Sequence, residues 1–108
     1  MASQEKVIEF LGDSLERLRD FPDDARQTAG YWLGEIQRGK TPLHYRPMPD
    51  VGSGVYELKI REASGQFRVF YVAKHKDAIY VLHCFQKKSQ ATVQHDIELG
   101  RTRYKEIP

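Results

Sequence analysis

The segment Val55–Glu62 (VYELKIRE) decides the fold, together with the two segments that follow it, Phe67–Ala73 (FRVFYVA) and Ala78–Phe85 (AIYVLHCF). The first alternates apolar and charged side chains, which predicts a strand with one face towards a core. The second is rich in aromatic and β-branched residues, which favour strands. The third is almost continuously apolar, as expected of a strand covered on both faces. The turn signals Ala63–Gln66 and Lys74–Asp77 join them into a predicted antiparallel meander.

The predicted meander carries a group of cations. Alternation places Lys59 and Arg61 on one face of the first strand, while Arg68 lies on the second strand and Lys87 and Lys88 end the third. Side chains on one face of neighbouring strands come within about 5 Å, or about 7–8 Å diagonally. Like charges at these distances repel, so folding alone would not select such a cluster. A bound anion would relieve the repulsion.

The N-terminal half is predicted to be mainly helical. Lys6–Leu11 alternates as a first strand. Asp13, with Glu16 three residues later, has the pattern of a capping box and predicts a short helix to about Asp20. A second helix is predicted over Pro22–Arg38, because proline suits a helix start and Gly39 follows as a stop. The two helices are expected to form a hairpin on one face of the sheet.

The segments that flank the meander have different characters. Lys40–Gly54 is rich in proline and glycine and predicts an ordered loop. Beyond the meander, Thr92 is expected to cap a last helix from Val93 to about Tyr104, although Gly100 argues against great regularity. We find no internal repeat and no linker. The sequence therefore predicts an α+β fold and one domain over residues 1–108.

The composition is that of a soluble globular protein. The chain is 40% hydrophobic and 30% charged, which is ordinary for this class. No apolar run approaches the roughly 20 residues of a membrane span, and the N-terminus lacks the apolar segment of a signal peptide. Cys84 is the single cysteine, so no internal disulfide is possible. These features favour a cytoplasmic protein that does not engage a membrane.

Charge is distributed unevenly along the chain. Residues 1–58 hold 7 Lys/Arg and 10 Asp/Glu, and residues 59–108 hold 10 Lys/Arg and 5 Asp/Glu. A basic C-terminal half points towards an anionic partner such as nucleic acid. On charge alone, a solvated surface with a chance asymmetry is the simpler explanation.

Metal, cofactor and thiol chemistry are not predicted. The four histidines have no metal-binding spacing, and a lone histidine in a strand is more often half-buried than a ligand; they are His44, His75, His83 and His95. Cys84 is expected to face the core, where thiols are inert. Glycine-rich phosphate loops are also missing from the sequence. We therefore predict a site without a metal or cofactor.

Cations and aromatic side chains remain as the candidate site. Phosphodiester cleavage needs positive charge that stabilises a developing oxyanion, and a ribose 2′-hydroxyl supplies its own nucleophile. Tyr71, Tyr80 and Phe85 would stack on bases if they were exposed. Burial in the core is the alternative for each of these aromatic residues. The sequence thus indicates a candidate RNA-binding surface.

The chain resembles a known family along most of its length. The runs that carry the resemblance are GVYELKIR (54–61), FRVFY (67–71) and LHCFQKKSQ (82–90), with Phe21-Pro22 upstream and Arg103 near the C-terminus. Together they are similar to the phage-derived Gp49-like, or HigB-type, toxins of the RelE/ParE superfamily. These are the toxins of type II toxin–antitoxin modules. The resemblance covers roughly residues 5–104 and implies a strand, a helical hairpin, an antiparallel meander and a C-terminal helix.

The resemblance also implies an activity and its residues. RelE-like members are ribosome-dependent endoribonucleases that cut mRNA without a metal. Carried over to this chain, Arg61 and Arg68 would stabilise the phosphate, Lys59 would be a candidate base, and Lys88 would be a candidate acid or phosphate clamp. The predicted RNA-binding residues are Lys87, Tyr71, His83 and His95.

Some features depart from the RelE pattern and keep alternatives open. Glu57 stands where some RelE proteins have a further lysine, as is usual in the Gp49-like branch. The tyrosine that some RelE members use near the C-terminus has no clear match, so His95, His83 or His44 remain candidates for its role. A ParE-like gyrase poison and an inactive, purely binding member are the alternative functions. Ion pairs that occupied the cations, for instance with Glu62 or Asp96, would weaken the nuclease hypothesis.

The resemblance finally implies partners. They are mRNA on the ribosome and a helix-turn-helix antitoxin encoded next to the toxin. The oligomeric state, the codon preference and the surface that contacts the antitoxin are not predicted by the sequence.

Overall fold

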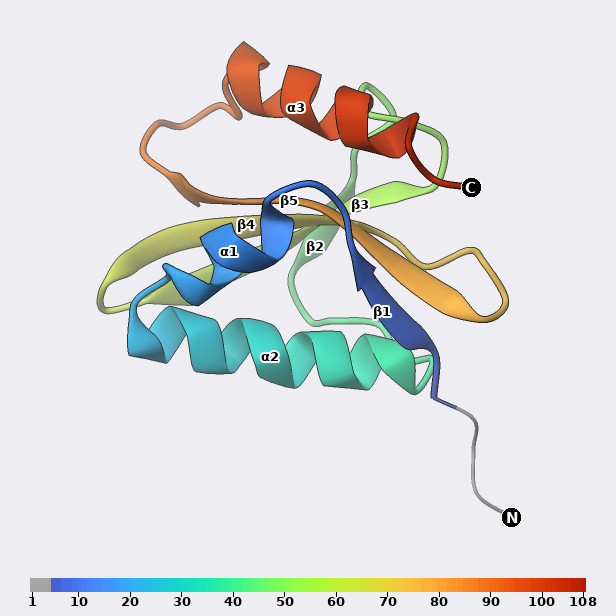
Figure 1. Ribbon diagram of the computed structural model, residues 1–108. Coiled ribbons are helices and arrows are strands. Elements are labelled where there is room, and N and C mark those ends of the chain that lie inside the picture. The colour runs from blue at the N-terminus through green and yellow to red at the C-terminus, as the bar shows by residue number, and fades with distance from the viewer. Residues whose placement is uncertain (1–4) are drawn as a thin grey trace.

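The computed structural model describes residues 5–108 and is built around a five-stranded sheet between two helical layers (Figure 1). The strands are β1 (Val7–Phe10), β2 (Tyr45–Pro47), β3 (Val55–Glu62), β4 (Gly65–Val72) and β5 (Ala78–Lys87). The helices are α1 (Ser14–Arg19), α2 (Asp23–Gln37) and α3 (Gln94–Tyr104). The α+β class is confirmed, and the predicted elements occur in the predicted order, with the strand β2 in addition.

The sheet has the strand order β1-β5-β4-β3-β2. β1 pairs parallel with β5, and the other neighbours pair antiparallel. The hairpin between β3 and β4 is tighter than the sequence suggested, because Glu62 and Gly65 already pair across a two-residue turn. The loop predicted at Lys40–Gly54 contains the short edge strand β2, which pairs with the first half of β3. Three residues, one of them proline, are too few to produce a period in the sequence.

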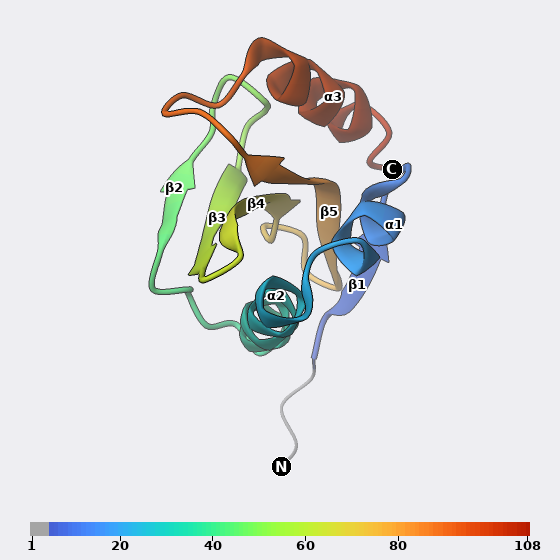
Figure 2. The ribbon, with the colours of Figure 1, turned by 90° about the vertical axis from the view of Figure 1, so that its left-hand side faces the viewer.

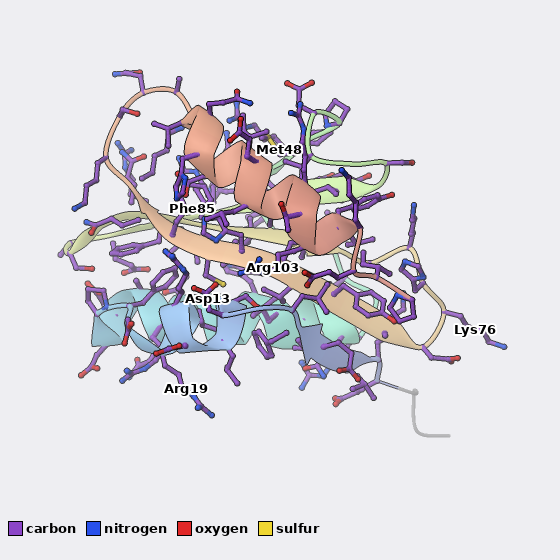
Figure 3. All side chains as sticks on the ribbon, turned by 45° about the horizontal axis from the view of Figure 1, so that its top comes forward. Asp13, Arg19, Met48, Lys76, Phe85 and Arg103 are labelled. Atoms are coloured by element: carbon purple, nitrogen blue, oxygen red, sulfur yellow. The ribbon has the colours of Figure 1, made fainter. Side chains whose placement is uncertain are left out.

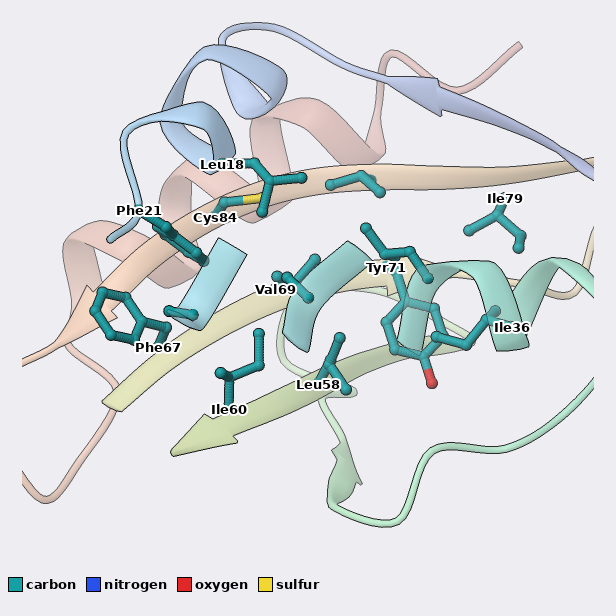
Figure 4. Close-up of a cluster of buried hydrophobic side chains, with 14 residues drawn as sticks. Leu18, Phe21, Ile36, Leu58, Ile60, Phe67, Val69, Tyr71, Ile79 and Cys84 are labelled. Carbon is teal, nitrogen blue, oxygen red and sulfur yellow. The ribbon is translucent and has the colours of Figure 1, made fainter. Parts of the chain in front are cut away.

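Helices cover both faces of the sheet (Figure 2), and each face has its own apolar core. The first core lies under α1 and α2, and Figure 4 shows Leu58, Ile60 and Val69 of the sheet in one cluster with Leu18 of α1 and Ile36 of α2. The second core lies under α3 and includes Met48, Phe70, Leu82 and Phe85. Complete burial of one such side chain stabilises the fold by about 1.5–3 kcal/mol. The continuous apolar pattern of β5 is thereby explained, because both of its faces are covered.

The two caps expected from the sequence differ from those in the structure. Asp13 does occupy the N-cap position of α1, but its side chain caps no backbone amide. It pairs instead with Arg17 at 2.8 Å and with Arg103 of α3 at 3.3 Å (Figure 3). Thr92 lies one residue before the N-cap of α3, which is Val93. Its hydroxyl donates to Glu57 and its oxygen accepts from Arg46, so charge-assisted hydrogen bonds take the place of a bond from a helix amide.

Two of the glycines inside the helices, Gly100 and Gly30, have different surroundings. Gly100 does not interrupt α3; a Cβ there would lie 2.9 Å from both Phe70 Cδ2 and Val51 Cγ1, so the helix packs closely on the sheet. At Gly30 of α2 a Cβ would meet nothing within 4 Å. Close packing therefore explains why residue 100 is a glycine. It does not explain the glycine at residue 30.

This difference gives a matched pair of substitutions. Gly30→Ala is expected to raise the free energy of unfolding by about 0.5–1 kcal/mol, since alanine favours a helix and meets no obstacle there. Gly100→Ala is expected to lower it by about 1–2 kcal/mol, because overpacking outweighs the same propensity gain. Urea denaturation of both variants checks this. A stabilised Gly100→Ala variant would contradict the close contact of α3 with Phe70.

Within residues 5–108, no helix combines the length and the apolar character needed to cross a membrane.

Candidate nucleic-acid site

The strand register brings the predicted cations onto one face of the sheet. Lys59 of β3 is directly opposite Arg68 of β4, and Gln66 lies opposite both Arg61 of β3 and Lys87 of β5. Residues directly opposite each other share a face and have Cβ atoms about 4.5–5.5 Å apart. The cations therefore converge on the α3 side of the sheet, near the end where β3 and β5 finish.

Two depressions meet on this surface. One, of about 560 Å³, is lined by Arg61, Gln66 and Arg68 together with the residues that end β5 and follow it, Lys87, Lys88, Ser89 and Gln90. The other, of about 650 Å³, shares Arg61, Gln66 and Arg68 and extends past Lys59 to His44, Thr28 and Trp32. We call the combined surface of Lys59, Arg61, Gln66, Arg68, Lys87 and Lys88 the basic groove. It is open to solvent.

Arg68 is the buried centre of the basic groove. Arg68 is only 6% exposed, yet it lines both depressions. Its Nη1 donates to the carbonyl oxygen of Phe67 at 3.0 Å, and its Nη2 donates to Oε1 of Gln66 at 3.2 Å. Burial lowers the pKa of the Arg68 guanidinium from its ordinary value, while Glu57 opposes this effect. Arginine nevertheless stays charged, so Arg68 is a fixed cation at the junction.

Glu57 lies beside Arg68 and is completely buried. Its Oε1 is 2.9 Å from Nε of Arg46 and 3.5 Å from Nε of Arg68. Its Oε2 accepts a hydrogen bond of 3.0 Å from the Thr92 hydroxyl. The sequence analysis assigned Thr92 to a helix cap and gave neither Arg46 nor Thr92 a role in the site. The available signal was Glu57 itself, a carboxylate on the charged face of a central strand, which requires cationic partners when it is buried.

Of the groove cations, Arg68 is paired with Glu57 at 3.5 Å, whereas the two carboxylates named from the sequence, Glu62 and Asp96, have other partners. Glu62 accepts a hydrogen bond from Thr28, and Asp96 pairs with His83. Neither carboxylate is paired with a cation of the basic groove among the described residues.

Lys87 is the lysine of the basic groove with a perturbed ammonium group. Partial burial lowers its pKa, and the positive charges of Arg68, Arg46 and Lys59 lower it further, against the opposing effect of Glu57. A lysine with a lowered pKa transfers protons more readily near neutral pH. The structure thus adds a candidate for proton transfer beside Lys59 and Lys88, which the sequence suggested.

The other predicted RNA-binding residues are not in the basic groove. Tyr71 is 3% exposed and lies in the core under α2 (Figure 4), where burial raises the pKa of its phenol. It pairs with Tyr56 across the sheet, which fixes it on the opposite face. Stacking of Tyr71 on a base is therefore excluded in this structure, and that prediction was wrong.

Neither His83 nor His95 lines the basic groove. His83 is 1% exposed, stacks on Phe85 and has its Nε2 2.7 Å from Oδ1 of Asp96. Burial lowers its pKa despite the carboxylate. With this burial it cannot touch RNA in the groove, so its predicted direct contact was wrong. His95 is exposed on α3 but lines neither depression. Phe85, under the start of α3 (Figure 3), and half-buried Tyr80 belong to the second core.

Metal and thiol chemistry have no evident place in the described part of the chain. Among residues 5–108, no three His, Cys, Asp or Glu side chains form a group that could hold a metal ion. Cys84 is buried, and burial strongly raises the pKa of its thiol. A metal-independent reaction remains a prediction that needs a chelator experiment.

The fold and the site define a class of protein. A solved structure of the E. coli toxin RelE, a double arginine-to-alanine mutant in the free state, matches with a TM-score of 0.66 and 15% sequence identity. The match covers 96% of this chain and 99% of the RelE chain. The chain therefore has the RelE fold.

The family follows from the sequence match. Residues 16–105 match the model of the family described as phage-derived protein Gp49-like. The chain belongs to the Gp49-like family, and the resemblance read from its sequence is confirmed. No curated protein sequence matches it significantly.

Proposed function

We propose that the protein is the toxin of a type II toxin–antitoxin system and cuts mRNA on the ribosome without a metal. Membership of the Gp49-like family and the RelE fold support the toxin role. The observation that carries the nuclease activity is Arg68, a buried cation at the junction of two open depressions and flanked by further cations. Such an arrangement binds a phosphate and stabilises the charge that develops on it.

The proposed reaction is an attack of the ribose 2′-hydroxyl on the adjacent phosphorus. The bond between the 2′-oxygen and phosphorus forms, and the bond from phosphorus to the 5′-oxygen breaks. One group removes the proton of the 2′-hydroxyl, and another gives a proton to the 5′-oxygen as it leaves. The products are a 2′,3′-cyclic phosphate and a 5′-hydroxyl. The ribose supplies the nucleophile, so the protein contributes positioning, charge and two proton transfers.

The register supports a division of roles around Arg68. The attacking and leaving oxygens must lie on opposite sides of the phosphorus, roughly in line. Lys59 lies directly across from Arg68 on β3, whereas Lys87 lies diagonally on β5. We assign Arg68 and Arg61 to the phosphate, Lys59 to the 2′-hydroxyl, and Lys87 to the leaving oxygen. Exposed Lys88 is left to bind the neighbouring phosphate.

The proposed partners follow from this reaction. The toxin works on translating ribosomes in the cytoplasm, and an antitoxin with a helix-turn-helix domain neutralises it between episodes of activity. Both expectations rest on the family, because the structure contains this chain alone.

The test is cleavage of a translated message by the purified chain. Primer extension on ribosome-bound mRNA is expected to show cuts inside translated codons. Since ribosomes need Mg²⁺, the assay keeps Mg²⁺ and adds phenanthroline to remove transition metals, and cleavage is expected to persist. Growth arrest without cuts, accompanied by DNA damage, would instead support a gyrase poison. Neither effect would indicate a member of the fold that only binds a partner.

A further inference from the structure

Glu57 is unusual because a fully buried carboxylate lies on the face that carries the basic groove. It sits in the middle of β3, two residues before Lys59, and none of its surface reaches solvent. A substrate phosphate in the groove cannot touch it. Burial of an unpaired carboxylate is costly, so the pairs that Glu57 makes are required for it to remain charged.

The contacts of Glu57 join three further parts of the chain. Arg46 comes from β2, Arg68 comes from β4, and Thr92 comes from the segment between β5 and α3. Arg46 also donates from Nη2 to the Thr92 hydroxyl oxygen at 3.0 Å, which closes a triangle of Glu57, Arg46 and Thr92. One carboxylate thus fixes the edge strand, the central cation of the groove and the segment that follows Lys88.

The chemistry of Arg68 shows what this connection does. Its two Nη atoms are held by Phe67 and Gln66. Its Nε is buried and has no hydrogen bond of good geometry, and the nearest carboxylate oxygen is that of Glu57 at 3.5 Å. Electrostatic attraction therefore holds this edge of the guanidinium. Without the Glu57 charge, Arg46 and Arg68 would be like charges without a shared counter-ion.

We propose that Glu57 is a positioning residue of the RNA-cleaving site. It fixes the guanidinium of Arg68 directly, and it holds the segment after Lys88 against the sheet through Thr92. This inference rests on the proposed function. Accurate placement of the phosphate-binding group matters for rate, because a displacement of about 1 Å can cost about 10²-fold. The glutamate that departs from the RelE pattern thereby gains a role in the site.

The variant that tests this is Glu57→Gln, which preserves size and removes the charge. Single-turnover cleavage of ribosome-bound mRNA, with the toxin in excess, separates the maximal rate from the half-saturating concentration. We expect the maximal rate to fall by about 10-fold or more. We expect RNA binding to be unchanged or tighter, because one negative charge beside the groove is removed. A loss of folding would lower the maximal rate and also weaken RNA binding. A general effect of charge on binding would leave the maximal rate unchanged.

Glu35→Gln is the matched control. Glu35 lies on α2 and is a partly buried carboxylate that, like Glu57, lies near two cations, Arg38 at 3.6 Å and Lys40 at 3.7 Å. The substitution makes the same charge change away from the basic groove. Its maximal rate is expected to equal that of the wild type.

Thr92→Val is a milder second variant in case Glu57→Gln does not fold. It removes the hydroxyl that links the segment after Lys88 to Glu57 and leaves the Arg46 pair in place. A several-fold fall in the maximal rate with unchanged melting temperature is expected. An unchanged rate in folded forms of both variants would overturn the inference.

A measurement without RNA separates this inference from the proposed function. The Nε–H signals of Arg46 and Arg68 in NMR spectra report the environment that Glu57 creates, and Glu57→Gln is expected to shift both, while Glu35→Gln is not. If the wild-type chain cleaves no RNA, the proposed function fails. Unchanged arginine signals would in that case overturn the positioning role as well, and shifted signals would support the placement of Arg68 by Glu57.

Discussion

Replacement of Arg68 by alanine is expected to lower the maximal rate of mRNA cleavage by about 10²–10³-fold, the usual effect of removing one oxyanion-stabilising donor. Arg68 is the buried one of the two cations that line both depressions, and the structure holds its guanidinium in one place. A preorganised donor needs no rearrangement when charge develops on the phosphate. The effect should therefore appear mainly in the rate at saturation, measured by single-turnover primer extension.

Two further variants make this result specific. Arg68→Lys keeps the charge but loses the planar fork that holds two phosphate oxygens, so it should recover only part of the activity. Arg101→Ala removes an exposed arginine of α3 that donates to the carbonyl oxygen of Asp50, and it should cleave like the wild type. Glu57 keeps Arg46 and Thr92 as partners in Arg68→Ala, so the variant should fold. Full activity of a folded Arg68→Ala protein would remove Arg68 from the reaction.

The parts of the site that were predictable come from strand periodicity. The alternation of β3 placed Lys59 and Arg61 together, and the hairpin to β4 then placed Arg68 beside them. The same reasoning would have removed Tyr71 from the candidates. It has the parity of Phe67 and Val69, which face the core under α2, and not that of Arg68. The error came from weighing aromatic character above position in the strand.

The carboxylate network was beyond sequence reasoning for a different reason. Arg46 and Thr92 are 11 and 35 residues from Glu57 in the chain. Arg46 lies in a three-residue edge strand within a proline-rich loop. Such a strand is too short for an alternation of apolar and polar residues that would indicate which face its side chain is on. Thr92 has the pattern of a helix cap, a local role that explained it sufficiently. Long-range pairing overrode both local signals, because a buried charge must be satisfied by whichever segments the fold brings near it.

Lys87→Met is expected to reduce cleavage about 10²-fold or more, in keeping with the loss of a general acid, without lowering the stability of the fold. In the folded protein, partial burial and the neighbouring cations lower the pKa of Lys87 below its ordinary value. The unfolded chain therefore binds this proton more tightly. As pH rises from the lowered pKa to the ordinary value of 10.5, this difference should increase the free energy of unfolding of the wild type. The Lys87→Met variant should lack this increase.

Urea denaturation at neutral and alkaline pH checks the stability, and the pH profile of cleavage checks the role. If Lys87 is the acid, wild-type cleavage falls as pH rises through its lowered pKa. Lys76→Met, at an exposed lysine in the turn before β5, is the control and should alter neither measurement. A Lys87→Met protein that unfolds more easily at neutral pH would show that the ammonium stabilises the fold. Stability of the fold would then be enough to explain Lys87. The proposed site instead requires that Lys87 destabilises the free protein, because its counter-charge is the phosphate of the bound substrate.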